Sequence, residues 1–143
     1  MYDLKRLLLF FSLFYPLFLY ANCPKPSEVT YGCTVIFGKK HCNWGAPWYE
    51  GFPEDSAKNN DKAAFFEKVF WGSKNNPPQP SDIGSTVCMY ISPYGNIIKL
   101  VQNRWGEVPY PHEKVWKDGY WEGYPGRECY EGIARCHFPY PLL

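Results

Sequence analysis

Six cysteines are the residues of this sequence whose number and spacing most clearly imply a chemistry. An even number of cysteines in a short exported chain predicts three disulfides, although spacing alone leaves many pairings open. Two pairs flank turn-like segments, 38–40 and 131–132, so each would close a short hairpin. The remaining two cysteines are then left to bond each other. The expected pairs are Cys33–Cys42, Cys129–Cys136 and Cys23–Cys88.

Metal chemistry is the next possibility, because His41 and Cys42 follow Cys33 closely. Their spacing matches no zinc pattern and the chain has no C-x-x-C motif, so we expect neither a metal nor another cofactor. His112 and His137 stand apart in aromatic or polar surroundings. Ordinary hydrogen-bonded surface histidines are the simpler interpretation.

Catalytic constellations are not evident either. The nucleophile motif G-x-S-x-G is missing, and an even cysteine count leaves no free thiol for nucleophilic attack. Dispersed acids such as Glu54, Glu107 and Glu113 keep one alternative open, a small secreted hydrolase with paired carboxylates in the manner of a glycosidase. A second alternative is a protease-inhibitor-like scaffold that presents a rigid loop at 75–82. We expect no catalytic residue.

Aromatic residues carry more functional information than any polar cluster. Six of them are interleaved with glycine and proline in the segment 105–124, and exposed rings of this kind supply flat contact surface for proteins and sugars. The predicted ligand-binding residues are Trp105, Tyr110, Trp116, Tyr120, Trp121 and Tyr124. The competing interpretation is core filling, because aromatic residues outnumber aliphatic ones in this chain and some must be buried.

The N-terminus has the layout of a secretory signal. Lys5 and Arg6 precede the apolar stretch Leu7–Tyr20, which is followed by the small residue Ala21. A bilayer-spanning helix needs about 20 apolar residues, so a cleaved signal is expected rather than a permanent anchor. Cleavage after Ala21 leaves one domain, residues 22–143, and places the mature protein outside the cytosol, secreted or periplasmic.

Charge excludes some partners. The leader carries two of the 15 basic and one of the 14 acidic side chains, so the mature chain has no net formal charge. A neutral chain argues against nucleic acid and against an electrostatic hold on a membrane. We expect a monomer whose partner is a protein or a carbohydrate.

Several segments have the patterns of strands. Alternating apolar residues in 29–37 predict a strand, and two apolar runs within 86–102 predict a hairpin that turns at 93–96. Asp118-Gly119 is a strong two-residue turn signal and predicts a second hairpin over 114–122. Segments 127–130 and 134–138 would form a short terminal pair.

Other segments are loops or stay ambiguous. Residues 43–60 are typical of a loop with at most one short strand, and 73–82 of an extended loop. Residues 61–71 fit either a helix that begins at Asp61 or a strand with Phe65, Val69 and Trp71 on one face. The fold class expected is therefore mainly β, a small antiparallel sheet or sandwich-like domain held by disulfides, with at most one short helix.

A set of short motifs is shared with a known group of proteins. The motifs are Cys23-Pro24 with Pro26-Ser27 and Val29, Trp44-Gly45, Cys88-Met89-Tyr90, and Cys129 with Cys136 and Phe138-Pro139. This pattern resembles a family of small exported bacterial proteins of unknown function. The resemblance implies an exported β-rich domain and supplies no catalytic residues. His137 and the pair Cys33 and Cys42 depart from the family pattern.

The function expected from these observations is a non-enzymatic, exported binding module. Its ligand, a protein or a glycan, would be met by the aromatic-rich loops around 105–124.

Overall fold

The computed structural model describes residues 20–51, 62–73, 75–102 and 107–140, and within them the chain is mainly β. The mainly β fold class expected from the sequence is confirmed. The strands are β1 (Tyr20–Ala21), β2 (Thr30–Ile36), β3 (Lys39–Ala46), β4 (Tyr49–Gly51), β5 (Phe65–Ser73), β6 (Ile83–Ile91), β7 (Ile97–Gln102), β8 (Val108–Pro109), β9 (Lys117–Trp121), β10 (Tyr124–Cys129) and β11 (Phe138–Pro139). One short 3-10 helix, η2 (Pro26–Glu28), precedes β2.

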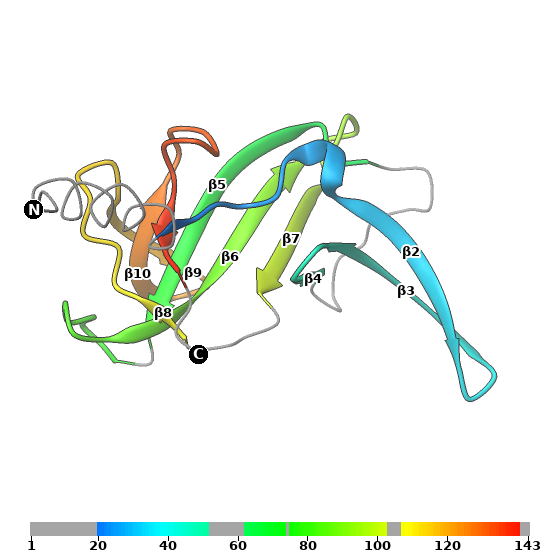
Figure 1. Cartoon of the computed structure of the whole chain (residues 1–143), viewed down its shortest axis with the longest axis horizontal. Helices are drawn as coiled ribbons and strands as arrows, with labels where there is room; N and C mark the ends of the chain where they lie inside the picture. Colours follow the sequence, from blue (N-terminus) through cyan, green and yellow to red (C-terminus); the bar gives the residue numbers. More distant parts are fainter. Residues whose placement is uncertain (1–19, 52–61, 74, 103–106, 141–143) are drawn as a thin grey trace, which may run out of the picture.

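A nine-stranded antiparallel sheet is the frame of the molecule (Figure 1). Its main path runs β2-β3-β4-β7-β6-β5-β10-β9, and β8 pairs with the first residues of β6. A second, two-stranded sheet joins β1 to β11. Cleavage after Ala21 would remove β1 and leave β11 without this partner.

The central strand β6 is buried on both of its faces. On one face Cys88 and Tyr90 belong to the main core, which also contains the buried residues of β5, β7, β8 and β11. On the opposite face, called here the outer face, Val87 and Met89 form a smaller core with Phe70. A strand buried on both sides has a nearly continuous apolar sequence, as the segment 87–91 has.

The N-terminal segment is tied to β6 by two bonds. Cys23 forms a disulfide with Cys88, and the Tyr90 hydroxyl donates a hydrogen bond to the carbonyl oxygen of Pro24 over 2.5 Å. Both contacts are buried, so this segment closes one side of the main core.

All six cysteines are paired as the sequence analysis expected. The Cys23–Cys88 and Cys129–Cys136 bridges lie in the main core, whereas the Cys33–Cys42 bridge crosses an exposed hairpin. The chain is therefore cross-linked both inside and at its periphery.

Residues 61–71 contain a strand, which resolves the ambiguity between helix and strand. The expected faces were wrong, however, because a β-bulge shifts the register between Phe66 and Lys68. The extra residue reverses the alternation of side chains. Phe65 therefore lies on the outer face, whereas Val69 and Trp71 lie in the main core.

The hairpin of 86–102 is confirmed as β6 and β7, but the hairpin predicted at 114–122 was wrong in its turn. Asp118 and Gly119 lie inside β9, and the turn is at Glu122 and Gly123, where φ is +49° and +83°. Two successive residues with positive φ suit the twist of a tight hairpin.

Two further expectations need correction. The expected terminal pair does not form, because β11 pairs with β1 while the segment that contains Arg127 pairs with β5 and β9. The segment 43–60 is less loop-like than expected, since its described part contains the end of β3 and all of β4. The loop expected at 73–82 is confirmed for residues 75–82.

Candidate binding surface

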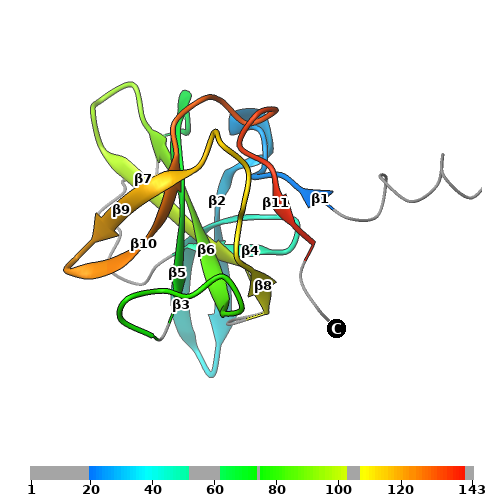
Figure 2. The ribbon, with the colours of Figure 1, turned by 90° about the vertical axis from the view of Figure 1, so that its left-hand side faces the viewer.

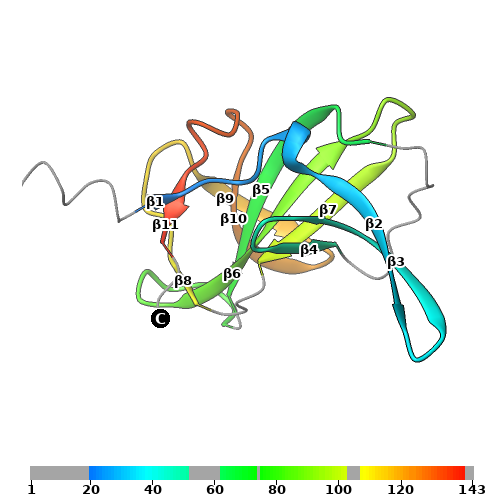
Figure 3. The same ribbon diagram turned by 45° about the vertical axis from the view of Figure 1, so that its right-hand side comes forward.

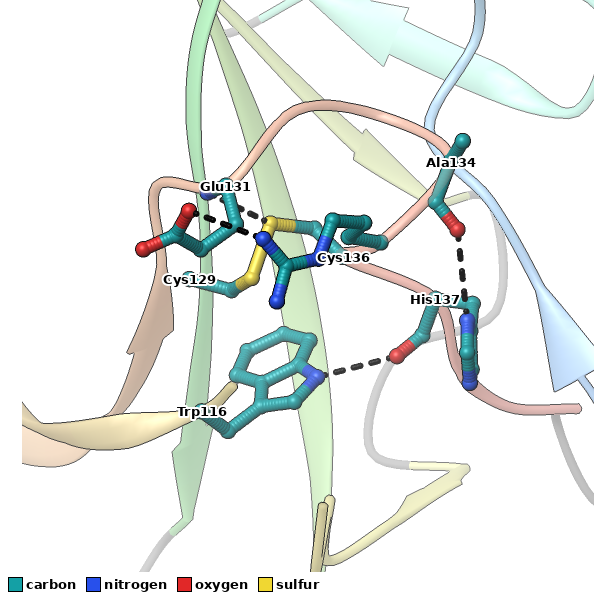
Figure 4. Close-up of a disulfide and its surroundings, with 7 residues drawn as sticks. Trp116, Cys129, Glu131, Ala134, Cys136 and His137 are labelled. Carbon is teal, nitrogen blue, oxygen red and sulfur yellow. Dashed lines mark hydrogen bonds and ion pairs between the residues drawn. A yellow bond between two sulfur atoms is a disulfide. The ribbon is translucent and has the colours of Figure 1, made fainter. Parts of the chain in front are cut away.

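The aromatic residues singled out in the sequence do not form one surface. Trp105 lies outside the described residues. Trp116 is only 2% exposed, so it belongs to the core and is not available to a ligand. Its ring lies against the Cys129–Cys136 disulfide, and its indole Nε1 donates a hydrogen bond to the carbonyl oxygen of His137 over 2.9 Å (Figure 4).

Tyr110 is also largely occupied by contacts within the protein. Its ring meets the Trp71 ring edge-on at 5.2 Å and the Arg127 guanidinium at 5.3 Å, while His112 lies 4.8 Å away. These neighbours assign Tyr110 a packing role at the edge of the main core.

The other three aromatic residues lie at the tip of the β9–β10 hairpin, on different faces. Trp121 is directly opposite Tyr124, whereas Tyr120 pairs with Pro125 and points to the other face. Tyr120 and Tyr124 are exposed, while Trp121 is half-buried against Phe70, with ring centroids 6.0 Å apart. Of the expected residues that the structure describes, therefore, only these two tyrosines offer free rings.

The β9–β10 hairpin folds across the outer face of the sheet (Figure 2). The Lys99 ammonium, on β7, lies 5.8 Å from the Trp121 ring and 4.0 Å from the Glu122 carboxylate. Strands β5 and β6 separate β7 from β10 in the sheet, so the hairpin tip must reach over them. Trp121 thereby covers the smaller core.

Beyond the reach of this hairpin, the outer face carries a partly exposed apolar row. Phe65, Ile91 and Ile97 are directly opposed across β5, β6 and β7. Phe65 is 67% exposed and Ile97 is 49% exposed. Ile91, between them, is half-buried. A cross-strand row of apolar side chains of which two are exposed makes a patch of the kind that marks interaction sites.

A second row on the same face carries charge. Lys68 and Lys99 flank the buried Met89 in register. The Lys68 ammonium lies 3.3 Å from the Glu128 carboxylate and 3.2 Å from the Tyr130 hydroxyl. Burial opposes the charge of Lys68, but the hydrogen bond with Tyr130 and the Glu128 carboxylate together hold the pKa of its ammonium above the ordinary value.

We call these two rows, together with the Tyr130 ring beside Lys68, the outer-face surface. It consists of Phe65, Lys68, Ile91, Ile97, Lys99 and Tyr130. The sequence does not reveal it, because its members come from three strands, from both sides of a bulge and from the residue that follows β10. The available signal was the turn at 93–96, which fixes the register of Ile91 with Ile97.

Of the carboxylates considered for hydrolysis, the structure describes Glu107 and Glu113, and their surroundings differ. Glu54 lies outside the described residues. Glu113 is paired with His137 through Nε2 of the imidazole, and the same ring contacts Tyr20 edge-on at 4.7 Å. One oxygen of Glu107 is buried without a hydrogen-bond partner in the described part of the chain. Glu113 thus contacts an imidazole rather than a second carboxylate.

The loop at 75–82 is held in shape by one carboxylate. Asp82 accepts hydrogen bonds from the Gln79 backbone N–H at 2.6 Å, the Asn75 side chain at 2.7 Å and the Ser73 hydroxyl at 3.0 Å. The Gln79 bond, ahead of the two side-chain bonds, lowers the pKa of Asp82 below its ordinary value of 3.8. The stabilisation of the loop by these bonds is therefore fully present above pH 3.8 and is lost as pH falls through the lowered pKa of Asp82.

Comparisons with known proteins identify no homologue. No protein-family model matches the chain, and neither a curated protein nor a solved structure gives a match. Three disulfides fit an oxidising compartment. Among the described residues, no helix combines the length and the hydrophobicity that crossing a bilayer requires.

Proposed function

We propose that this protein is an exported binding module without catalytic activity, which docks a protein ligand on its outer-face surface. The observation that carries the proposal is a cross-strand row of exposed Phe65, half-buried Ile91 and exposed Ile97 beside two lysines. Burying a fully exposed side chain of these types contributes about 1.5–3 kcal/mol, and each of these would contribute in proportion to the part that is still exposed. The lysine ammonium groups and the Tyr130 hydroxyl supply the polar rim that protein interfaces have.

A protein ligand is favoured over a glycan by the chemistry of the row. Sugars stack on flat, exposed aromatic rings, whereas two of these three side chains are branched aliphatics that fit the apolar core of a protein interface. The exposed rings of Tyr120 and Tyr124 lie on opposite faces of their hairpin and cannot form one stacking platform.

The test compares capture by wild-type protein and by a variant that carries Phe65→Ser and Ile97→Ser. Immobilised oxidised protein is incubated with extracts of cell envelopes and of surrounding medium, and bound proteins are quantified by mass spectrometry. We expect a ligand that the wild type enriches and that the variant retains at least about tenfold less, the loss typical of a central interface residue.

The matched control carries Trp48→Ser and Tyr124→Ser, which remove two exposed rings elsewhere. It should capture the same ligand as the wild type. Equal capture by all three proteins would reject the outer-face surface, and selective binding of the wild type to a glycan array would replace the protein ligand by a carbohydrate.

One specific observation favours a second candidate, a protease inhibitor. Canonical-type inhibition needs an exposed loop held in one conformation, and Asp82 provides such support for residues 75–82. Inhibition of a panel of secreted proteases by the wild type, lost in Asp82→Ala, would support this candidate. Cleavage of the loop without inhibition would reject it.

A further inference from the structure

Strands β2 and β3 form an arm that runs out from the body of the molecule (Figure 1 and Figure 3). The base of the arm is packed, since Trp44 is buried and the Tyr31 ring lies 5.4 Å from it. Toward the tip the cover ends. Val35 and Ile36 are exposed, and Phe37, in the turn, is fully exposed.

The outer edge of this arm is unprotected. Among the described strands, β2 pairs only with β3 and ends the path of the large sheet. Its seven residues, Thr30–Ile36, contain no charged side chain and no proline. Proteins usually place charges, prolines or bulges on an exposed edge strand to prevent pairing with another chain. Because β2 contains no charged side chain and no proline, its open edge is suited to pairing with a strand of another chain.

The disulfide shows which backbone groups face outward. Cys33 and Cys42 are directly opposed with their Cα atoms 4.0 Å apart, the short spacing of a pair that exchanges no hydrogen bonds. The N–H and C=O of Cys33 therefore point away from β3. Because the pattern repeats every second residue, the same groups of Tyr31 and Val35 also face the open edge.

We propose that two copies of this chain pair antiparallel through β2 and join their large sheets into one. Only the register centred on Cys33 pairs the whole strand, with Thr30 opposite Ile36 of the second copy. In that register the outward N–H and C=O groups of Tyr31, Cys33 and Val35 in each copy form hydrogen bonds with the same three residues of the other copy. The proposal replaces the monomer expected from the sequence and is independent of the proposed function.

Side-chain complementarity supports this register. Directly opposed residues share a face, so Tyr31 of one copy stands beside the partner's Val35 at two symmetric positions. A pair of an aromatic and a β-branched side chain is among the favourable cross-strand pairs. The exposed Val35 thereby gains a neighbour on the face of β2 that it shares with Tyr31.

Charge is also compatible with antiparallel pairing. The tip of the arm is basic, with Lys39 and Lys40 after the turn, and the exposed Glu28 precedes β2 at the base. Antiparallel strands bring the tip of one arm to the base of the other, so Glu28 approaches the partner's Lys39. No like charges meet along the paired strands themselves, because β2 has none.

Sedimentation of the oxidised protein from micromolar to millimolar concentration tests the dimer. We expect a concentration-dependent dimer in the wild type and an affinity at least about tenfold lower in Val35→Pro, because proline removes an outward N–H at two symmetric positions. The N–H of Val35 makes no bond to β3, so the arm itself should stay folded. Slow hydrogen exchange at the amides of Gly32 and Thr34, which face β3, verifies that it does.

Val35→Thr is the matched variant, since threonine keeps the N–H and the branched shape. It should weaken the dimer much less than Val35→Pro. Residue-resolved hydrogen exchange gives a second readout: amides of Tyr31, Cys33 and Val35 should gain protection as the concentration rises, while those of Gly32 and Thr34 are protected throughout.

A protein that stays monomeric to about 1 mM would overturn the proposal, because an edge contact weaker than that falls below the range of specific association. A dimer equally stable in Val35→Pro would overturn it too. Anionic lipid vesicles that protect residues 35–40 of a monomer would assign the arm to a membrane surface instead.

Discussion

Trp116 illustrates why an aromatic residue can look like a binding residue in the sequence and serve the core in the structure. Its ring is apolar except at Nε1, and the only requirement for burial is an acceptor at that atom. The carbonyl oxygen of His137 is that acceptor, and the chain is held there by the neighbouring Cys129–Cys136 disulfide.

Replacing Trp116 should therefore affect stability rather than binding. We expect Trp116→Ala to lower the free energy of unfolding by about 3–5 kcal/mol, the usual cost of emptying a buried aromatic site. Tyr124→Ala, at a position 65% exposed, should change it by no more than about 0.5 kcal/mol. Urea unfolding followed by circular dichroism measures both. Similar values for the two variants would contradict the assignment of Trp116 to the core.

Tyr49 makes the stability of the protein sensitive to alkali. Burial, opposed by the hydrogen bond from Gln102, raises the pKa of Tyr49 from 10.0 to about 12. The folded protein therefore holds this phenol neutral where the unfolded chain would ionise it. Its contribution to stability is complete below pH 10.0 and is lost as pH rises toward about 12.

The urea midpoint of the wild type should accordingly fall between pH 10 and 12. Burial raises the pKa of Tyr90 as well, so both phenols contribute to this fall. Tyr49→Phe has no phenol at that position and should show a shallower decline over the same range. An identical pH dependence in the two proteins would show that the pKa of Tyr49 is the same in the folded protein as in the unfolded chain.

At the scale of elements, glycine permits the close contact of β10 with β5. Gly126 is directly opposite Gly72, and the Phe70 ring lies over both. A Cβ on Gly126 would collide with the backbone oxygen of Trp71 and would come 2.6 Å from the Phe70 ring. The backbone oxygen cannot move without displacing the strand.

Gly126→Ala should thus destabilise the protein by about 1–3 kcal/mol, the range for overpacking. Gly32 is a matched control, because it is also in a strand and a Cβ there would meet nothing within 4 Å. Gly32→Ala should be neutral or stabilising by a few tenths of a kcal/mol. Thermal unfolding of the two variants measures the difference, and equal melting temperatures would contradict the close packing.

The bulge in β5 is the element that sequence periodicity could not reveal. The alternation of apolar residues in 65–71 supports a strand, but an extra residue between Phe66 and Lys68 reverses which side chains share a face. Bulges depend on the partner strand as much as on the bulged one, and a single sequence does not contain that information locally.

For the whole molecule, the three disulfides should contribute unequally. In the chain-entropy model the Cys23–Cys88 bridge, with a separation of 65, is worth about 4 kcal/mol, against about 2.5 kcal/mol for Cys33–Cys42 with a separation of 9. The first bridge also anchors the segment that closes the main core, whereas the second stabilises an exposed arm.

Replacing both cysteines of each bridge by alanine tests this difference. We expect the Cys23 and Cys88 variant to lose at least 1 kcal/mol more of unfolding free energy than the Cys33 and Cys42 variant, as measured by urea unfolding under non-reducing conditions. Equal losses would mean that the arm is coupled to the core more tightly than its exposure indicates.

The chain alone predicted the β class and the β6–β7 hairpin, because these follow from local alternation and turn residues. Short loops between cysteines suggested Cys33–Cys42 and Cys129–Cys136, whereas Cys23–Cys88, with a separation of 65, was expected only as the pair that remained. The sequence also predicted a hairpin in this part of the chain, but it placed the turn at Asp118-Gly119 instead of Glu122-Gly123. The strong turn dipeptide lies inside a strand. Tertiary contact overrode that local preference, since Gly119 pairs with Gly126.

Burial and adjacency of distant residues were decided only by the folded structure. Whether Trp116 is covered, whether Phe65 stands beside Ile91, and whether the edge of β2 is open all depend on which strands meet across the sheet. Those pairings are set by the packing of the whole chain, in which each strand gains most of its stability from neighbours far away in sequence.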